Sequence, residues 1–84
     1  MEEMIKQMLK NGYNIEYGQL SICQIKVNGW AKWQVYCDNY RYHDAMIYEY
    51  NDEALDSAVR DFMNIKNGLD RDNLKNSKRR DISV

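Results

Sequence analysis

The stretch Ser21 to Cys37, SICQIKVNGWAKWQVYC, decides the fold, because two runs rich in β-branched and aromatic residues flank the pair Asn28-Gly29. An Asn-Gly pair readily supplies the positive φ angles that a tight reversal of the chain needs. The stretch therefore predicts a β-hairpin.

The loop length of this hairpin determines which side chains share a face. A two-residue loop would set Trp33 beside Gln24, whereas a loop of three or five residues separates apolar from polar side chains. We therefore expect the longer loop, with the odd-numbered face buried and Trp33 inside. The buried face then consists of Cys23, Ile25, Val27, Ala31, Trp33, Val35 and Cys37, and the polar face of Gln24, Lys26, Lys32 and Gln34.

The chain before the hairpin predicts a helix and the start of a strand. Residues 2–11 have a helical apolar stripe, and Gly12 can take the left-handed position of a Schellman cap. Residues 13–17 then alternate between apolar and polar side chains and predict a strand that bends at Gly18. The stripe consists of Met4, Ile5, Met8 and Leu9.

The chain after the hairpin predicts a third strand at residues 45–50 and a second helix at residues 52–67. Asn51 or Asp52 can cap this helix. Its apolar residues follow a helical period, and we expect it to stop at Lys66-Asn67-Gly68. These apolar residues are Leu55, Ala58, Val59, Phe62 and Met63. In the third strand either Ile47, or Met46 together with Tyr48, faces inward.

The predicted fold class is α+β in the order α-β-β-β-α, a three-stranded antiparallel meander with both helices packed on one face. Residues 1–68 form a single α+β domain. Residues 69–84 contain few apolar side chains, so we expect a polar, partly basic and mobile C-terminal tail.

The composition excludes several classes of protein. The chain has 84 residues, a formal net charge of −1 and two cysteines, without an apolar run long enough to cross a membrane or to serve as a signal peptide. These features favour a cytoplasmic protein that does not bind membranes. Cys23 and Cys37 could form a cross-strand disulfide in a five-residue-loop hairpin, but a reducing compartment favours two free thiols.

We expect neither catalysis nor a cofactor. The one histidine, His43, lies in a polar loop near Cys37, and one short loop rarely provides a nucleophile, a base and an orienting group together. Cys23, Cys37 and His43 offer at most three ligands without a close cysteine pair, which does not match a zinc site.

The distribution of charge predicts a partner. Residues 38–61 contain seven acidic side chains against Arg41 and Arg60, and several tyrosines lie among them. Tyrosine supplies rigid contact area and carboxylates steer association, so we expect this acidic face to bind a host protein with a basic surface. The predicted partner-binding residues are Asp38, Tyr40, Tyr42, Asp44, Tyr48, Glu49, Asp52, Glu53 and Asp56. The sequence also allows a homodimer.

The alternative function is that of a nucleic-acid-binding accessory protein. The element order is also that of the double-stranded RNA binding domain, but the helix start that carries lysines in that family is acidic here, from Asn51 to Asp56. Nucleic acid would therefore bind weakly, through the basic tail. The basic residues of this tail are Lys75, Lys78, Arg79 and Arg80.

The stretches LKNGYNI, ICQIKVNG and NDEALDSAVRDFMNIKNG together give a layout that resembles the small phage-encoded anti-CRISPR proteins that inhibit type II-A Cas9. Those proteins likewise place a short helix, a three-stranded meander with an Asn-rich turn and a C-terminal helix in a short acidic chain. The resemblance implies a non-enzymatic phage or mobile-element protein that inhibits or modulates a host protein, such as a defence nuclease.

Overall fold

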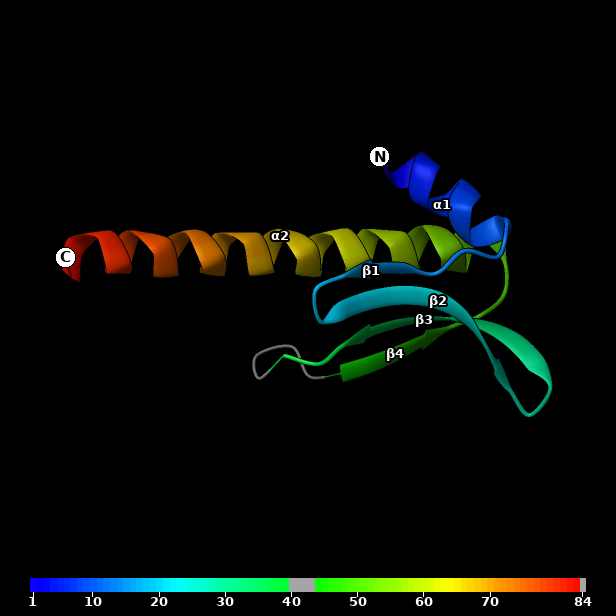
Figure 1. The fold of residues 1–84 in the computed structure, drawn as a ribbon. Coiled ribbons are helices and arrows are strands. Elements are labelled where there is room, and N and C mark those ends of the chain that lie inside the picture. Colours follow the sequence, from blue (N-terminus) through cyan, green and yellow to red (C-terminus); the bar gives the residue numbers. More distant parts are fainter. Residues whose placement is uncertain (40–43, 84) are drawn as a thin grey trace.

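The computed structural model describes the backbone of residues 1–39 and 44–83 and the side chains of residues 1–39 and 44–72. The described residues form two helices and an antiparallel sheet of four strands in the order β1-β2-β3-β4 (Figure 1). The elements are α1 (Glu2–Lys10), β1 (Ile15–Tyr17), β2 (Leu20–Val27), β3 (Trp30–Cys37), β4 (Asp44–Tyr48) and α2 (Asp52–Ser83). The predicted fold class, α+β with an antiparallel meander, is confirmed.

The sheet has one strand more than the sequence pattern indicated, in the part of the chain that is described. Gly18, with a φ of 61°, does not merely bend a strand, because Tyr17 pairs with Leu20 across a turn. The residues expected to form one bent strand therefore form the hairpin of β1 and β2. A positive φ suits glycine, which lacks the Cβ that would clash there.

The central hairpin has a two-residue loop, so the predicted register is wrong. Val27 pairs with Trp30, and Gln24 lies opposite Trp33. Asn28 and Gly29 have φ angles of 53° and 85°, as in the type I′ turn whose twist matches that of the strands. This turn chemistry outweighs the separation of apolar from polar side chains.

The corrected register turns every side chain of β2 to the other face. Cys23, Ile25 and Val27, which were expected in the core, lie on the outer face of the sheet. Gln24 shares the face of Trp33 but is exposed. The turn of this hairpin extends beyond the helices (Figure 1). Cys23 lies opposite Gln34 and not opposite Cys37, and both cysteines are free thiols.

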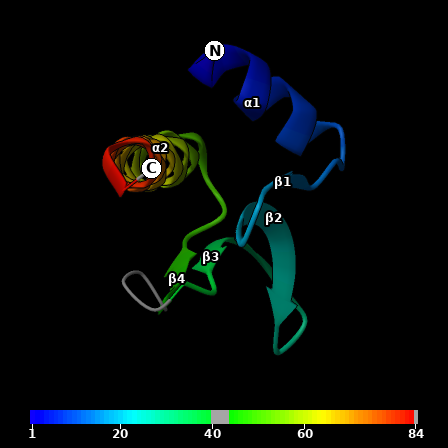
Figure 2. The ribbon, with the colours of Figure 1, turned by 60° about the vertical axis from the view of Figure 1, so that its left-hand side comes forward.

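The core lies between the sheet and the two helices, which sit on the same side of it (Figure 2). Trp33 is buried, as predicted. In β4, Met46 and Tyr48 pack against the core while Ile47 is exposed, which answers the question that the sequence left open. The buried side chains are Ile5, Leu9, Leu20, Ile22, Trp33, Val35, Cys37, Leu55, Ala58, Val59 and Phe62.

Helix α1 ends in the predicted Schellman cap. Gly12 has a φ of 89°, its N–H donates to the carbonyl of Leu9, and the N–H of Tyr13 donates to the carbonyl of Met8. Two carbonyls that the helix end would leave without partners are thereby bonded.

Helix α2 begins as predicted and ends much later. The side chain of Asn51 accepts a hydrogen bond from the N–H of Ala54, so Asn51 is the N-cap. The helix then continues through Gly68 to Ser83, and the stop predicted at Gly68 is wrong. A glycine inside a helix costs only about 1 kcal/mol relative to alanine, and here Leu69 extends the packing against the core.

A contact with the sheet supports the helix beyond Gly68. The Tyr17 hydroxyl donates to the Asp70 carboxylate, and Lys66 Nζ lies 3.1 Å from the same carboxylate and above the Tyr17 ring. Over the described residues, neither helix has a stretch apolar and long enough to cross a lipid bilayer.

Candidate functional site

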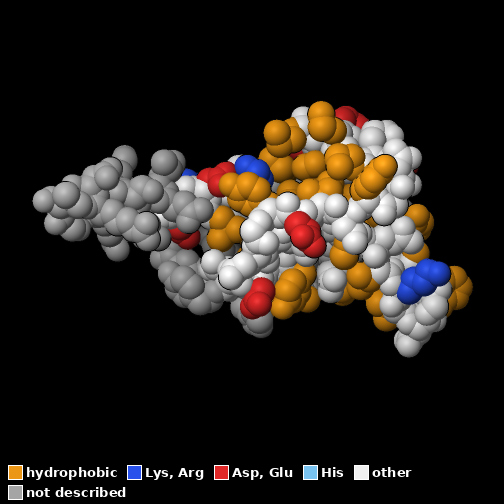
Figure 3. All heavy atoms as spheres, in the orientation of Figure 1, with side chains coloured by type: hydrophobic (Ala, Val, Ile, Leu, Met, Phe, Trp, Pro, Cys, Tyr) orange, Lys and Arg blue, Asp and Glu red, His pale blue; other side chains and the backbone are white. Residues whose placement is uncertain are grey.

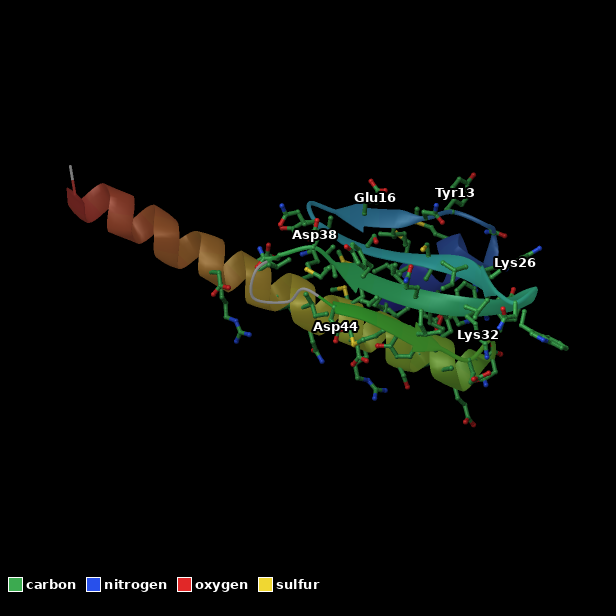
Figure 4. All side chains as sticks on the ribbon, turned by 90° about the horizontal axis from the view of Figure 1, so that it is seen from below. Tyr13, Glu16, Lys26, Lys32, Asp38 and Asp44 are labelled. Atoms are coloured by element: carbon green, nitrogen blue, oxygen red, sulfur yellow. The ribbon has the colours of Figure 1, made fainter. Side chains whose placement is uncertain are left out.

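The outer face of the sheet is the side turned away from α1 and α2 (Figure 4). The strand register places eleven described side chains on it, because alternate residues of each strand share a face. They are Glu16, Ser21, Cys23, Ile25, Val27, Trp30, Lys32, Gln34, Tyr36, Ala45 and Ile47.

Much of this outer face is apolar. Trp30 is 74% exposed, Ile47 49% and Val27 40%. Ile25 and Cys23, which precede Val27 on the same face of β2, are half-buried. An antiparallel sheet with one face on a core usually has a polar opposite face. A run of large apolar side chains at these positions is typical of an interaction surface.

Carboxylates lie around the apolar part. Glu16 is on the edge strand β1, and Asp38 and Asp44 are at the end of the sheet where β3 leads toward β4 (Figure 4). At the opposite end, the carboxylate of Glu49 lies 2.7 Å from Lys32 Nζ. Asp44 has the register of the buried face, whereas the other three carboxylates lie at the rim of the outer face. The outer face therefore carries apolar side chains on β2, β3 and β4, with polar side chains of β3 among them, and an acidic rim.

An open cleft of about 550 Å³ lies at the hairpin end, between the start of β3 and the connection from β4 to α2. We call it the aromatic cleft; it is lined by Trp30, Ala31, Lys32, Glu49, Tyr50 and Asn51. The Tyr50 ring is held in place by Trp33, on which it stacks with ring centroids 4.8 Å apart. The N–H of Asn51 also donates to the carbonyl of Glu49, which fixes this connection.

The predicted acidic residues do not form one face. Asp38 and Asp44 lie at one end of the sheet, whereas Glu49, Asp52, Glu53 and Asp56 lie at the other end, around the start of α2. Several of these carboxylates are bonded to lysines of the chain itself, which reduces the charge they present. Asp52 lies 3.4 Å from Lys10, Asp56 pairs with Lys6, and Glu49 pairs with Lys32.

The Lys6 ammonium holds the pKa of Asp56 below its usual value, chiefly through their hydrogen bond. The pKa of Lys6 is raised for the same reason. This ion pair joins α1 to α2.

The predicted tyrosines have different surroundings. Tyr48 is half-buried, packs against the core and donates a hydrogen bond to Asp61. Burial raises the pKa of its hydroxyl, and the bond to Asp61 raises it further. Tyr48 therefore serves the packing of β4 on α2. Tyr40, Tyr42 and His43 lie outside the described residues, as do the side chains of the basic tail.

The prediction missed the residues that give the outer face its apolar character, above all Trp30, Val27 and Ile47. The error follows from the register, which placed Val27 inside. The signal that could have found them is Asn28-Gly29 itself, because this pair favours a two-residue loop.

A second apolar surface lies between α1, β1 and α2, where hydrophobic side chains gather over α1 (Figure 3). It forms a shallow groove of about 230 Å³ with Met1, Met4, Met8, Ile15 and Met63 in its lining. Flexible methionines fill irregular gaps and adapt to varied contacts.

Among the described residues, no three His, Cys, Asp or Glu side chains are arranged to hold a metal ion. Comparison of the chain with protein-family models, with curated proteins and with solved structures found no match. The outer face and the aromatic cleft are therefore the features of the chain that bear on its function.

Proposed function

We propose that this chain is a non-enzymatic protein that binds a partner protein through the outer face of its sheet and thereby inhibits or modulates that partner. The observation that carries the proposal is Trp30, a large aromatic side chain 74% exposed at one end of a sheet face that also carries Ile25, Val27 and Ile47. Exposed tryptophan is among the residue types that contribute most to binding between proteins.

The arrangement of apolar and charged groups supports this function. Interfaces commonly have an apolar centre, and a polar rim that excludes water from it. Here Ile25, Val27 and Ile47 contribute apolar surface, while Asp38 and Glu49 lie at the rim. Two of the acidic residues predicted from the sequence thus keep their proposed role, in a different surface.

The charge of the rim favours a partner with a basic surface. Glu16, Asp38 and Glu49 outnumber Lys32 around this face in the part of the chain that is described. Two copies of the chain that met through this face would bring like charges together, which costs free energy. A basic partner gains attraction and faster association from the same rim.

The resemblance to anti-CRISPR proteins makes a type II-A Cas9 loaded with guide RNA the first partner to test, and the bacterial cytoplasm the proposed compartment. Binding is measured by biolayer interferometry with the full-length chain. W30A and I47S should each weaken binding by about tenfold or more, since both remove exposed apolar contacts of the outer face. M4A is the matched control, because Met4 is 66% exposed on α1, in the other layer.

The surface and the partner class are tested separately. If Cas9 is not bound, p-benzoylphenylalanine placed at position 30 or at position 4 identifies a partner by crosslinking in cells. The affinities of W30A, I47S and M4A for that purified partner are then compared. Wild-type affinity for W30A and I47S would contradict the outer-face proposal. Loss of function only when Lys75, Lys78, Arg79 and Arg80 are changed to Gln would favour the nucleic-acid alternative.

A further inference from the structure

The aromatic cleft is built to hold a cation. Trp30 and Tyr50 form walls that are 74% and 52% exposed, and the side chain of Glu49 is 72% exposed beside them. Aromatic faces attract cations through their quadrupole, and a carboxylate adds direct charge attraction. The cleft already contains one cation of the chain itself, because Lys32 Nζ lies 2.7 Å from the Glu49 carboxylate.

The pair between Lys32 and Glu49 can be exchanged. An exposed pair of lysine and carboxylate contributes little to stability, since water screens it. A guanidinium group offers more than an ammonium: it bonds a carboxylate through two parallel N–H groups and stacks on aromatic rings. Glu49 would thus gain bonds when an arginine takes the place of Lys32.

The side of the cleft formed by Tyr50 and Glu49 is held in position before any ligand arrives. Tyr50 stacks on the buried Trp33, and the N-cap of α2 at Asn51 fixes the connection that carries Glu49 and Tyr50. A preformed site binds with a smaller entropic cost than one that must be ordered.

We propose that the aromatic cleft binds an arginine side chain of the partner protein, with the guanidinium between Trp30 and Tyr50 and bonded to Glu49. This inference rests on the proposed function, since it names the chemical group that the partner inserts beside the outer face. Lys32 occupies the position of that arginine in the free protein.

The test uses the full-length chain and the peptide acetyl-Gly-Arg-Gly-amide, with the citrulline peptide of the same shape as the uncharged comparison. Binding is followed by NMR through the indole N–H signal of Trp30. The arginine peptide should bind saturably and the citrulline peptide at least about tenfold more weakly. E49Q should reduce affinity for the arginine peptide by a similar factor, whereas K32M should increase it, because Lys32 competes for Glu49.

E53Q is the matched control, because it makes the same charge change at an exposed helix position that does not line the cleft. Equal binding of the two peptides, equal loss in E49Q and E53Q, or weaker binding in K32M would each overturn the proposal. I47S separates it from the proposed function: Ile47 lies outside the cleft lining, so I47S should weaken partner binding but not peptide binding. A partner that depends on Ile47, with no arginine binding, would refute the cleft proposal alone.

Discussion

The ring of Tyr50 stacks on the indole of Trp33, with the ring centroids 4.8 Å apart and the planes inclined by 24°. Trp33 belongs to β3 and Tyr50 to the connection into α2, so this contact joins the sheet to the start of the helix. It also forms the boundary between the core and the aromatic cleft. Changes at Trp33 should therefore affect both stability and binding.

Replacing Trp33 tests how the core uses this residue. W33A should lower the free energy of unfolding by about 3–5 kcal/mol, since it removes a fully buried aromatic ring. W33F should cost less than about 1.5 kcal/mol, because the indole N–H is buried without an acceptor among the described residues and its removal offsets part of the lost packing. Urea unfolding measures both values. Equal costs for W33A and W33F would contradict this view of the indole N–H.

Replacing Gly12 tests the cap of α1. G12A should destabilise the protein by about 1 kcal/mol, because alanine is strained at a φ of 89°. A Cβ at this position would meet nothing within 4 Å, so the cost comes from the backbone alone. G12N is the control and should cost less, since asparagine tolerates the left-handed region. Thermal unfolding followed by circular dichroism measures the difference; no loss in G12A would argue against the cap.

Acid should weaken the contacts of Asp56 and Asp70. The hydrogen bond from Lys6 lowers the pKa of Asp56, and the hydrogen bond from Tyr17 lowers that of Asp70, both from an ordinary value of 3.8. The stability that these carboxylates contribute is present above pH 3.8 and is lost as the pH falls through their lowered values. The double variant D56N/D70N should therefore lose less stability than the wild type between pH 6 and 2.5, roughly the range over which carboxylates titrate. E53Q, at an exposed position, is the control in urea unfolding.

Alkali should weaken the contact of Tyr48. Burial and the bond to Asp61 raise the pKa of its hydroxyl above the ordinary value of 10.0. The stability from this raised pKa is present below pH 10.0 and is lost as the pH rises toward the folded value. Y48F should flatten the fall of the melting temperature at alkaline pH, whereas Y13F, at an exposed ring, should not. An unchanged slope in Y48F would show that the hydroxyl does not titrate with folding.

Charge reversal separates the two ends of the acidic set. D38K/D44K changes the end of the sheet where β3 leads toward β4, including Asp38 at the rim of the outer face, while D52K/E53K changes the start of α2. The first should slow association with a basic partner, with a weaker dependence on salt, because exposed charges are screened over a Debye length of about 8 Å at physiological ionic strength. The second should have the smaller effect. Stopped-flow measurement of association rates at several salt concentrations compares the two variants. A larger effect of D52K/E53K than of D38K/D44K would favour the acidic face predicted from the sequence.

The features that depend on local chemistry could be predicted from the sequence. The periodic apolar residues of both helices, the glycine cap of α1 and the Asn51 cap of α2 each involve neighbours along the chain. The meander could be predicted because short connections join neighbouring antiparallel strands.

The features that depend on competition between local and distant contacts could not be predicted from the sequence. In the central hairpin, the preferred turn geometry and the separation of apolar from polar side chains favour different registers. The observed register is the one that the turn favours. Gly68 follows a Lys-Asn pair as Gly12 does, but Leu69 and the bonded Asp70 favour continued helix there. The acidic residues were close in sequence but were separated by the length of β4, so their common face could not be judged without the register.

The two-residue loop also has a practical consequence. It turns Cys23 to the outer face, where it is half-buried, while Cys37 is 1% exposed in the core. A thiol-reactive fluorophore should therefore label the folded chain at one position, beside Gln34 and close to the centre of the proposed interface. The proposed binding surface thus contains its own attachment point for a reporter dye, and occupancy by a partner could be followed without engineering a cysteine into the protein.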